Sequence, residues 1–325
     1  MDDTVGQLGE REVLRRILAR IGRSAAEVGP GDDAAVLAVP GERIVATTDT
    51  LVHGPDFRLA WSSGYDVGWK AAAVNLADIA AMGARPTALL VALTMPDDTP
   101  VAFVEALADG LREACAAVAP GCAVEGGDLA ASDTLTVAVT ALGVLDQDPV
   151  LRSGARAGDV VALAGDAGVA ARGLQLLFDR FRDADGAPVA VTDDAALTDA
   201  ERTALARQLR PHPPIAQGPL AAAAGATAMM DVSDGLVLDA TRLATASGVT
   251  VSIDTAPFAG EPLALTGGED HALLATFPAE SALLDGFRRI GEVRVAGAHP
   301  VLVDGEPPVG RGGWDPYADW DAARG

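Results

Sequence analysis

Apolar residues in the first half of the chain recur at spacings that predict alternating helices and strands. Val13, Leu14, Ile17, Leu18 and Ile21 follow helical spacing, so we expect an amphipathic helix over 8–21. Shorter apolar runs bounded by Gly and Pro predict strands. The other elements expected in this half are strands at 34–39, 43–52, 88–93, 122–125 and 135–144, and helices at 64–81 and 101–118.

The second half continues this mixture of helices and strands. A polar stretch, Asp146-Gln-Asp-Pro149, predicts a domain boundary, which gives domains at 1–148 and 149–325. The pattern indicates an α+β fold class. The expected elements are strands at 159–164, 249–253 and 271–277, helices at 170–182, 199–209, 215–224, 237–247 and 279–290, and two short strands near the end.

Carboxylates interrupt this apolar pattern next to glycines and at the ends of predicted elements. Oxygen-rich clusters of this kind suit hard cations, and Mg²⁺ is usually shared between carboxylates and substrate phosphates. They predict a metal–nucleotide site assembled from distant parts of the chain. The six clusters are Gly31-Asp-Asp33, Thr47-Thr-Asp49, Asn75-Leu-Ala-Asp78, Gly126-Gly-Asp128, Asp231-Val-Ser-Asp-Gly-Leu236 and Gly267-Gly-Glu-Asp270.

The cluster at 231–236 also has a structural interpretation. Asp231, Ser233 and Asp234 come just before a predicted helix, where such side chains ordinarily cap the free backbone N–H groups. The recurrence of carboxylates elsewhere favours the metal site, and the capping role stays open as the alternative.

The predicted helix at 64–81 places Lys70, Val74 and Asp78 on one side, four residues apart. This side is either a solvated face or part of a packed helix that presents Asp78 to a site. The surrounding alanines favour the packed helix. Lys70 is also the only lysine of the chain, so a Gly-Lys-Ser/Thr phosphate loop is excluded.

Composition and charge narrow the function classes. The chain has 325 residues, 49% of them hydrophobic, and a formal net charge of −22, which supports a substantial core and argues against a nucleic-acid surface. Divalent cations would reconcile this charge with phosphate binding. The acidic start and the lack of a run of ~18 apolar residues predict a cytoplasmic protein without membrane contact. Cys115 and Cys122 are expected to be buried free thiols.

The glycines in the stretch 160–177 do not match the G-x-G-x-x-G dinucleotide fingerprint. The six clusters, in this order, resemble instead the thiamine-monophosphate kinase family of the aminoimidazole ribonucleotide synthetase (PurM-like) superfamily. The terminal Gly313-Trp-Asp-Pro-Tyr317 extends the resemblance almost to the end of the chain.

This resemblance implies two α/β domains of the PurM-like type, with the N-terminal domain forming a homodimer through its sheet. ATP and several Mg²⁺ ions would bind between the domains, and thiamine monophosphate would be the acceptor. Asp128, Arg152 and Asp231 would act in catalysis. The implied metal ligands are Asp33, Thr47, Thr48, Asp49, Asp78, Asp128, Asp231 and Asp234. The implied nucleotide contacts are Gly127, Asp128, Arg152 and Ser233, and the implied substrate contacts are Asp56, Glu269 and Trp314.

Two positions depart from the family pattern. Asp56 stands where relatives can carry histidine, and His271 replaces a tyrosine that commonly follows Glu-Asp in the family. Both concern contacts with the substrate. For Trp314, the resemblance implies stacking on the thiazolium by cation–π attraction. An anchor that ties the tail to the domain is the alternative.

The implied reaction needs no nucleophilic side chain. The second pKa of a phosphate monoester is near ~6, so the acceptor is largely ionised at neutral pH, and the obstacle is repulsion between two anions. Catalysis would consist of in-line positioning and charge neutralisation by Mg²⁺, with Arg152 as an additional cation.

Two other functions stay open. One is another superfamily member, although the reactive N-terminal cysteine of selenophosphate synthetase and the C-terminal cysteine of the hydrogenase-maturation relative are absent. The other is a non-catalytic acidic protein that binds divalent ions.

Overall fold

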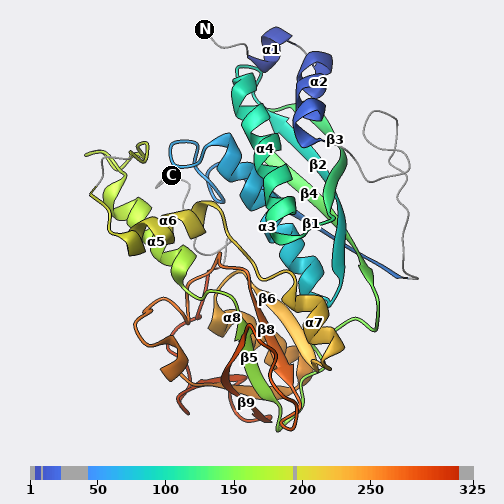
Figure 1. The fold of residues 1–325 in the computed structure, drawn as a ribbon. Helices are drawn as coiled ribbons and strands as arrows, with labels where there is room; N and C mark the ends of the chain where they lie inside the picture. The colour runs from blue at the N-terminus through green and yellow to red at the C-terminus, as the bar shows by residue number, and fades with distance from the viewer. Residues whose placement is uncertain (1–3, 9, 23–42, 193–195, 315–325) are drawn as a thin grey trace.

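The computed structural model describes residues 4–8, 10–22, 43–192 and 196–314, arranged around two β-sheets (Figure 1). Within these residues, the first sheet has four strands in the order β1-β4-β2-β3, and the second has six in the order β10-β7-β9-β5-β8-β6. Helices pack on both sheets, so the mixed α/β fold class is confirmed. The change from one sheet to the other falls between Leu145 and Val160, while the division into domains at 148/149 stays a prediction.

The first sheet is covered on one face by two long helices. A Cβ atom on Gly64 or Gly68 of α3 would collide with the backbone of α4, and one on Gly110 of α4 would collide with α3, so glycine permits the two backbones to touch. The elements of this half are α1 (Val5–Leu8), α2 (Glu10–Ile21), β1 (Arg43–Val52), α3 (Gly64–Ala81), β2 (Arg85–Met95), α4 (Val101–Val118), β3 (Ala123–Ala131) and β4 (Thr136–Leu145).

The second sheet is antiparallel except for the pairing of β10 with β7. Helix α8 packs against β6 and β7, and α5 pairs with α6 beside the sheet. The elements are β5 (Val160–Ala164), α5 (Val169–Arg180), α6 (Asp199–Leu209), α7 (Gln217–Ala223), β6 (Ala228–Val232), α8 (Leu236–Ser247), β7 (Val249–Ile253), a 3₁₀ turn (Ala256–Phe258), β8 (Ala272–Phe277), β9 (Phe287–Val295) and β10 (Val301–Val303).

Helix α3 lies between the two sheets and joins their cores. It contacts β1, β2 and β4 on one side and β6 and β8 on the other, and one apolar cluster runs through all of them. A capping box between Ser63 and Asp66 starts the helix. Lys70 is only 5% exposed and Asn75 is buried as well. The helix is therefore packed, as predicted, and the solvated-face alternative is wrong; that it presents Asp78 to a site stays a prediction.

Most predicted elements are present, including α3, α4, α6 and β7 with the expected bounds. The helix expected at 279–290 is wrong, because Phe287–Val295 forms the strand β9 between β5 and β7. Gly286 has a φ of 95°, and a Cβ on Gly291 would collide with the carbonyl of Ser252. Close pairing in the middle of a sheet thus overrides the local helical spacing.

Three further predictions concern the Gly126-Gly-Asp128 motif, the strand at 34–39 and the two cysteines. Gly126-Gly-Asp128 lies inside β3 rather than at the end of an element. The strand expected at 34–39 lies outside the described residues. Cys115 and Cys122 are buried free thiols, as predicted. Within the described part of the chain, no helix has the length and apolar character needed to cross a membrane.

Candidate active site

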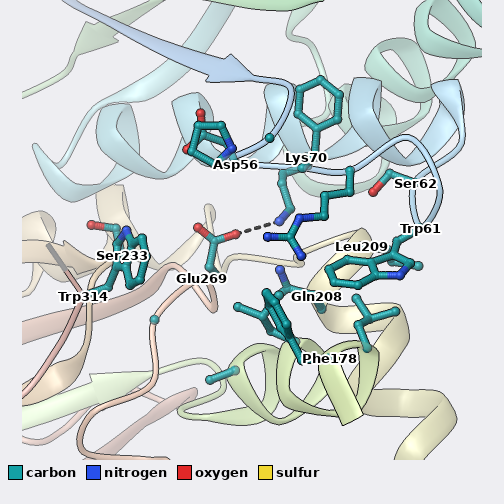
Figure 2. Close-up of a pocket in the computed structure, with 18 residues that line it drawn as sticks. Asp56, Trp61, Ser62, Lys70, Phe178, Gln208, Leu209, Ser233, Glu269 and Trp314 are labelled. Carbon is teal, nitrogen blue, oxygen red and sulfur yellow. Dashed lines mark hydrogen bonds and ion pairs between the residues drawn. The ribbon is translucent and has the colours of Figure 1, made fainter. Parts of the chain in front are cut away.

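A cavity of about 330 Å³ lies where the loop after β1, helix α3, the α5–α6 pair and the loops at 233 and 268–269 meet. Four of the predicted site residues line it, namely Asp56, Ser233, Glu269 and Trp314. Figure 2 shows Ser233 and Trp314 on one side, Lys70 and Glu269 in the middle, and Trp61, Phe178 and Leu209 on the other side. Three motifs far apart in the sequence therefore converge on one cavity.

An ion pair between the buried Lys70 and the half-buried Glu269 crosses the middle of the cavity. Nζ of Lys70 lies 2.6 Å from Oε2 of Glu269, and with the amide of Gln208 oriented to satisfy both of its atoms, its oxygen accepts from the same Nζ at 3.2 Å. Burial alone would raise the pKa of Glu269, but Lys70 and His271 outweigh it and hold this pKa below its usual value. Glu269 therefore presents an ionised carboxylate to the cavity.

The loop that carries Glu269 is fixed by backbone contacts. The N–H of Glu269 donates to the carbonyl of Ser233 at 2.8 Å, and a Cβ on Gly268 would collide with that carbonyl. Asp270 accepts from the N–H groups of Gly168 and Ala170 at 2.6 and 2.8 Å, at the start of α5. The Gly267–Asp270 motif is thus held against both the 231–236 motif and α5.

Carboxylates from three elements gather beside the cavity. Asp78 of α3 accepts from Oγ1 of Thr47 at 2.9 Å. Burial, followed by the charges of Asp231 and Asp49, raises the pKa of Asp78 to about 6. Oδ2 of Asp231 lies 3.2 Å from Nδ1 of His271. We call Asp49, Asp78 and Asp231 the acidic cluster, in which like charges oppose one another.

The start of α8 is not capped by Asp231, Ser233 or Asp234. Its N-cap, Gly235, has no capping side chain. The buried Asp239 instead accepts from the N–H groups of Asp234 and Gly235 at 3.1 and 3.2 Å. Arg242 donates to Asp234 and to Asp239, each at 2.6 Å. The capping alternative for Asp231, Ser233 and Asp234 is therefore wrong, and Asp239 was missed because it lies inside the predicted helix.

Some predicted residues lie away from the cavity and the acidic cluster. Thr48 pairs with Thr140, and Asp128 is aligned with Ala92, Ala138 and Thr50 across the sheet. Directly paired side chains share a face, so Thr48 and Asp128 lie on the face opposite Thr47. Among the described strands, β1 and β3 are the two edges of this sheet, about 14 Å apart at ~4.8 Å per strand. Gly127 sits beside Asp128 in β3, and a Cβ there would collide with the carbonyl of Val91.

Arg152 is also separate from the acidic cluster. The carbonyl of Arg152 accepts from Oγ of Ser247, which is the last residue of α8. A helix of 12 residues spans about 18 Å, so Arg152 lies near the end of α8 away from Asp234. Asp33 lies outside the described residues.

The tail residue Trp314 is held over the start of α8. Its backbone N–H donates to the carbonyl of Asp234 at 2.9 Å. Its side chain lines the cavity, and the residue is 43% exposed. The backbone thus anchors the tail and leaves the indole available to a ligand, so the two interpretations of Trp314 are compatible.

The acidic cluster offers carboxylate oxygens, and the neighbouring Thr47 offers a hydroxyl oxygen; oxygen ligands of this kind suit Mg²⁺. Among the described residues, no three His, Cys, Asp or Glu side chains stand close enough to hold a metal ion on their own. Mg²⁺ is usually held by one or two carboxylates together with water and substrate phosphates. Burial and the neighbouring carboxylates raise the pKa of Asp78, and this crowding of carboxylates fits a cation bound together with phosphate.

Residues 31–145 match the family described as "AIR synthase related protein, N-terminal domain". The thiamine-monophosphate kinase of Mycobacterium tuberculosis (strain ATCC 25618 / H37Rv) is 42% identical over 337 aligned residues, covering 98% of this chain and 94% of the relative.

Solved structures agree with the sequence comparison. The thiamine-monophosphate kinase from Stenotrophomonas maltophilia K279a is 33% identical, with a TM-score of 0.76 over 93% of this chain and 98% of that one. The structure "AaThiL complexed with AMPPCP and TMP" is 32% identical, with a TM-score of 0.71 over 83% of this chain and 86% of that one. The described motifs and these similarities lead to one conclusion: the chain belongs to the thiamine-monophosphate kinase family.

Proposed function

We propose that this protein transfers the γ-phosphoryl group of ATP to thiamine monophosphate and forms thiamine diphosphate, the last step in the biosynthesis of that cofactor. Its relatives carry the name of this activity, and a similar structure is described as a complex with AMPPCP and TMP. The observation that carries the proposal is the cavity, where Asp56, Glu269 and Trp314 surround a space beside Ser233 and the acidic cluster.

The two ends of thiamine monophosphate fit different parts of this space. Its thiazolium is permanently cationic, and Glu269 together with the indole of Trp314 offers the charge and the ring face that attract such a ring. Its phosphate would point toward Ser233, where the nucleotide phosphates would also lie. Asp128, Arg152 and Asp231 stay the proposed catalytic residues, with Gly127, Asp128, Arg152 and Ser233 at the nucleotide.

The transfer itself needs positioning rather than a base. An ionised oxygen of the acceptor phosphate attacks the γ-phosphorus in line, the bond to the β,γ-bridging oxygen breaks, and ADP leaves. Bound Mg²⁺ would supply the positive charge that lets two anions approach. The proposed ligands are Asp33, Thr47, Thr48, Asp49, Asp78, Asp128, Asp231 and Asp234.

A second copy of the chain would complete the site. The face of the first sheet opposite α3 carries Asp128 and Thr48 together with exposed apolar side chains, among them Ile44 at 56% and Leu90 at 36% exposure. A homodimer through this face would cover these apolar groups and surround Asp128 with the partner. Analytical ultracentrifugation of the wild type and of Ile44→Asp measures the oligomeric state. We expect a dimer only for the wild type.

The direct test is an assay with thiamine monophosphate, ATP and Mg²⁺, followed by chromatographic detection of thiamine diphosphate and ADP. We expect equimolar formation of both products. Hydrolysis of ATP without thiamine diphosphate, or no binding of ATP at all, would contradict the proposal. The latter result would favour a non-catalytic protein that binds divalent ions.

A further inference from the structure

Arg58 lines the cavity at the side away from Ser233, and part of its guanidinium has no partner. The residue is 9% exposed, and its Nη1 atom has no hydrogen-bond partner within the described part of the chain. Buried donors are nearly always paired, and leaving one unpaired destabilises the protein. A buried, unpaired donor on a cavity wall is explained if a ligand supplies the acceptor.

Two aromatic rings fix the position of this guanidinium. Its central carbon lies 4.7 Å from the ring centroid of Trp61 and 4.6 Å from that of Phe178. The two rings pack edge to face at 5.1 Å, and Nε1 of Trp61 donates to the carbonyl of Phe181 at 3.0 Å. Burial and the charge of Arg182 lower the pKa of Arg58. The guanidinium is thus held in place by stacking on the two rings.

The surroundings of Arg58 favour a flat, uncharged heteroaromatic ring over an anion. Leu174, Leu177, Phe178 and Leu209 make this side of the cavity apolar, and Figure 2 shows Trp61, Phe178 and Leu209 opposite Ser233 and Trp314. The transferred and accepting phosphates belong beside Ser233, because the acidic cluster is there. The group that reaches Arg58 is therefore the other end of the acceptor molecule.

We propose that Arg58 is a specificity-determining residue that donates a hydrogen bond from Nη1 to a ring nitrogen of the acceptor's aminopyrimidine, which packs among Trp61, Phe178 and Leu209. This inference rests on the proposed function and names a subsite for it. Gln208 and the Lys70–Glu269 pair lie next to this subsite. They offer further polar groups to the exocyclic amine.

The test compares two acceptors in the wild type and in Arg58→Met. One acceptor is thiamine monophosphate, and the other is the N-methylated thiazolium monophosphate without the pyrimidine. Methionine keeps apolar packing against the rings and removes the donor. Loss of a hydrogen bond from a charged donor should raise KM for thiamine monophosphate about 10- to 100-fold, at least ten times more than it raises KM for the fragment. The kcat for thiamine monophosphate should change far less than KM.

Arg182→Met is the matched control, because the Arg182 guanidinium lies 4.5 Å from the same Phe178 ring and does not line the cavity. Its KM for both acceptors should stay at the wild-type value. Arg58→Lys serves as a second variant if Arg58→Met folds poorly, and it should show the same selective loss because its ammonium replaces the planar fork. Equal changes for both acceptors, or none, overturn the inference. A wild type that does not phosphorylate thiamine monophosphate overturns the proposed function instead.

Discussion

The acidic cluster and the cavity beside it both contain carboxylates, but their surroundings shift the pKa values of these carboxylates in opposite directions. In the acidic cluster, burial and neighbouring carboxylates raise the pKa of Asp78 to about 6. In the cavity, Lys70 and His271 counteract burial and hold the pKa of Glu269 below its usual value. In the acidic cluster, His271 beside Asp231 does not offset burial and the neighbouring carboxylates, whereas in the cavity Lys70 pairs directly with Glu269.

This difference separates two kinds of binding site. Under the proposed function, the acidic cluster would need a bound cation to work, since its like charges oppose one another. The cavity is organised in advance by the Lys70–Glu269 pair and by the stacked Arg58, Trp61 and Phe178. We expect substitutions in the first region to affect turnover and metal dependence, and substitutions in the second to affect the choice of acceptor.

The largest effect should come from removing charge at the proposed metal ligands. Asp→Asn at Asp49, Asp128 or Asp231 keeps the size of the side chain and should lower kcat by orders of magnitude with folding intact, because transition-state charge is no longer neutralised. Steady-state kinetics and circular dichroism measure this. Asp199→Asn, at an exposed aspartate of α6, is the control. Full activity in all three variants would show that these aspartates do not serve the metal.

Metal removal should have the next largest effect. A chain with a formal net charge of −22 should repel free ATP, so calorimetry in EDTA should show little heat and calorimetry with Mg²⁺ should show clear binding. Tight binding of ATP in EDTA would mean that the acidic cluster does not need a cation, and the contrast between the two regions would then fail.

A smaller effect is expected at the boundary between the two regions. Trp314→Ala should weaken binding of thiamine monophosphate about threefold to thirtyfold, because the cation–π contact is worth ~0.5–2 kcal/mol, and it should leave the affinity for ATP unchanged. Trp314→Phe should recover part of the loss. Calorimetry measures the affinities of both variants for thiamine monophosphate and for ATP. A lower melting temperature with unchanged affinity would reduce Trp314 to an anchor.

The sequence predicts one of these regions better than the other. Asp49, Asp78 and Asp231 stand out because each interrupts an apolar element, and Glu269 stands out because of its glycines. The partnership of Lys70 with Glu269 joins residues 199 positions apart. Its only local signal is a lone lysine in an alanine-rich helix.

The contacts of Arg58 and the placement of Asp128 could not be predicted for a similar reason. The ring that Arg58 needs comes from Phe178 on α5, in the other half of the chain. The face on which Asp128 lies depends on strand register, since a shift of one residue reverses it. Long-range packing decides both, as it does for β9.

The smallest predicted effect is on stability and concerns Asp78. Its folded pKa of about 6 lies above the ordinary value of 3.8, so folding favours the protonated form. Stability from this group is greatest below about pH 4 and is lost as the pH rises through about 6. Between pH 5 and pH 7.5 the loss is about 1.4 kcal/mol, which corresponds to a fall in melting temperature on the order of 3 °C.

Asp78→Asn isolates this contribution, because Asp239 and Asp270 also have pKa values raised to about 6 by burial and titrate in both proteins. In EDTA, the wild type should lose stability relative to Asp78→Asn as the pH rises from 5 to 7.5. With saturating Mg²⁺ and ATP the order should reverse at pH 7.5, because only the ionised carboxylate holds a cation. Thermal scans at one heating rate measure both differences. A constant gap between the two proteins in EDTA would mean that Asp78 is not crowded by Asp231 and Asp49, and the acidic cluster would lose its contrast with the cavity.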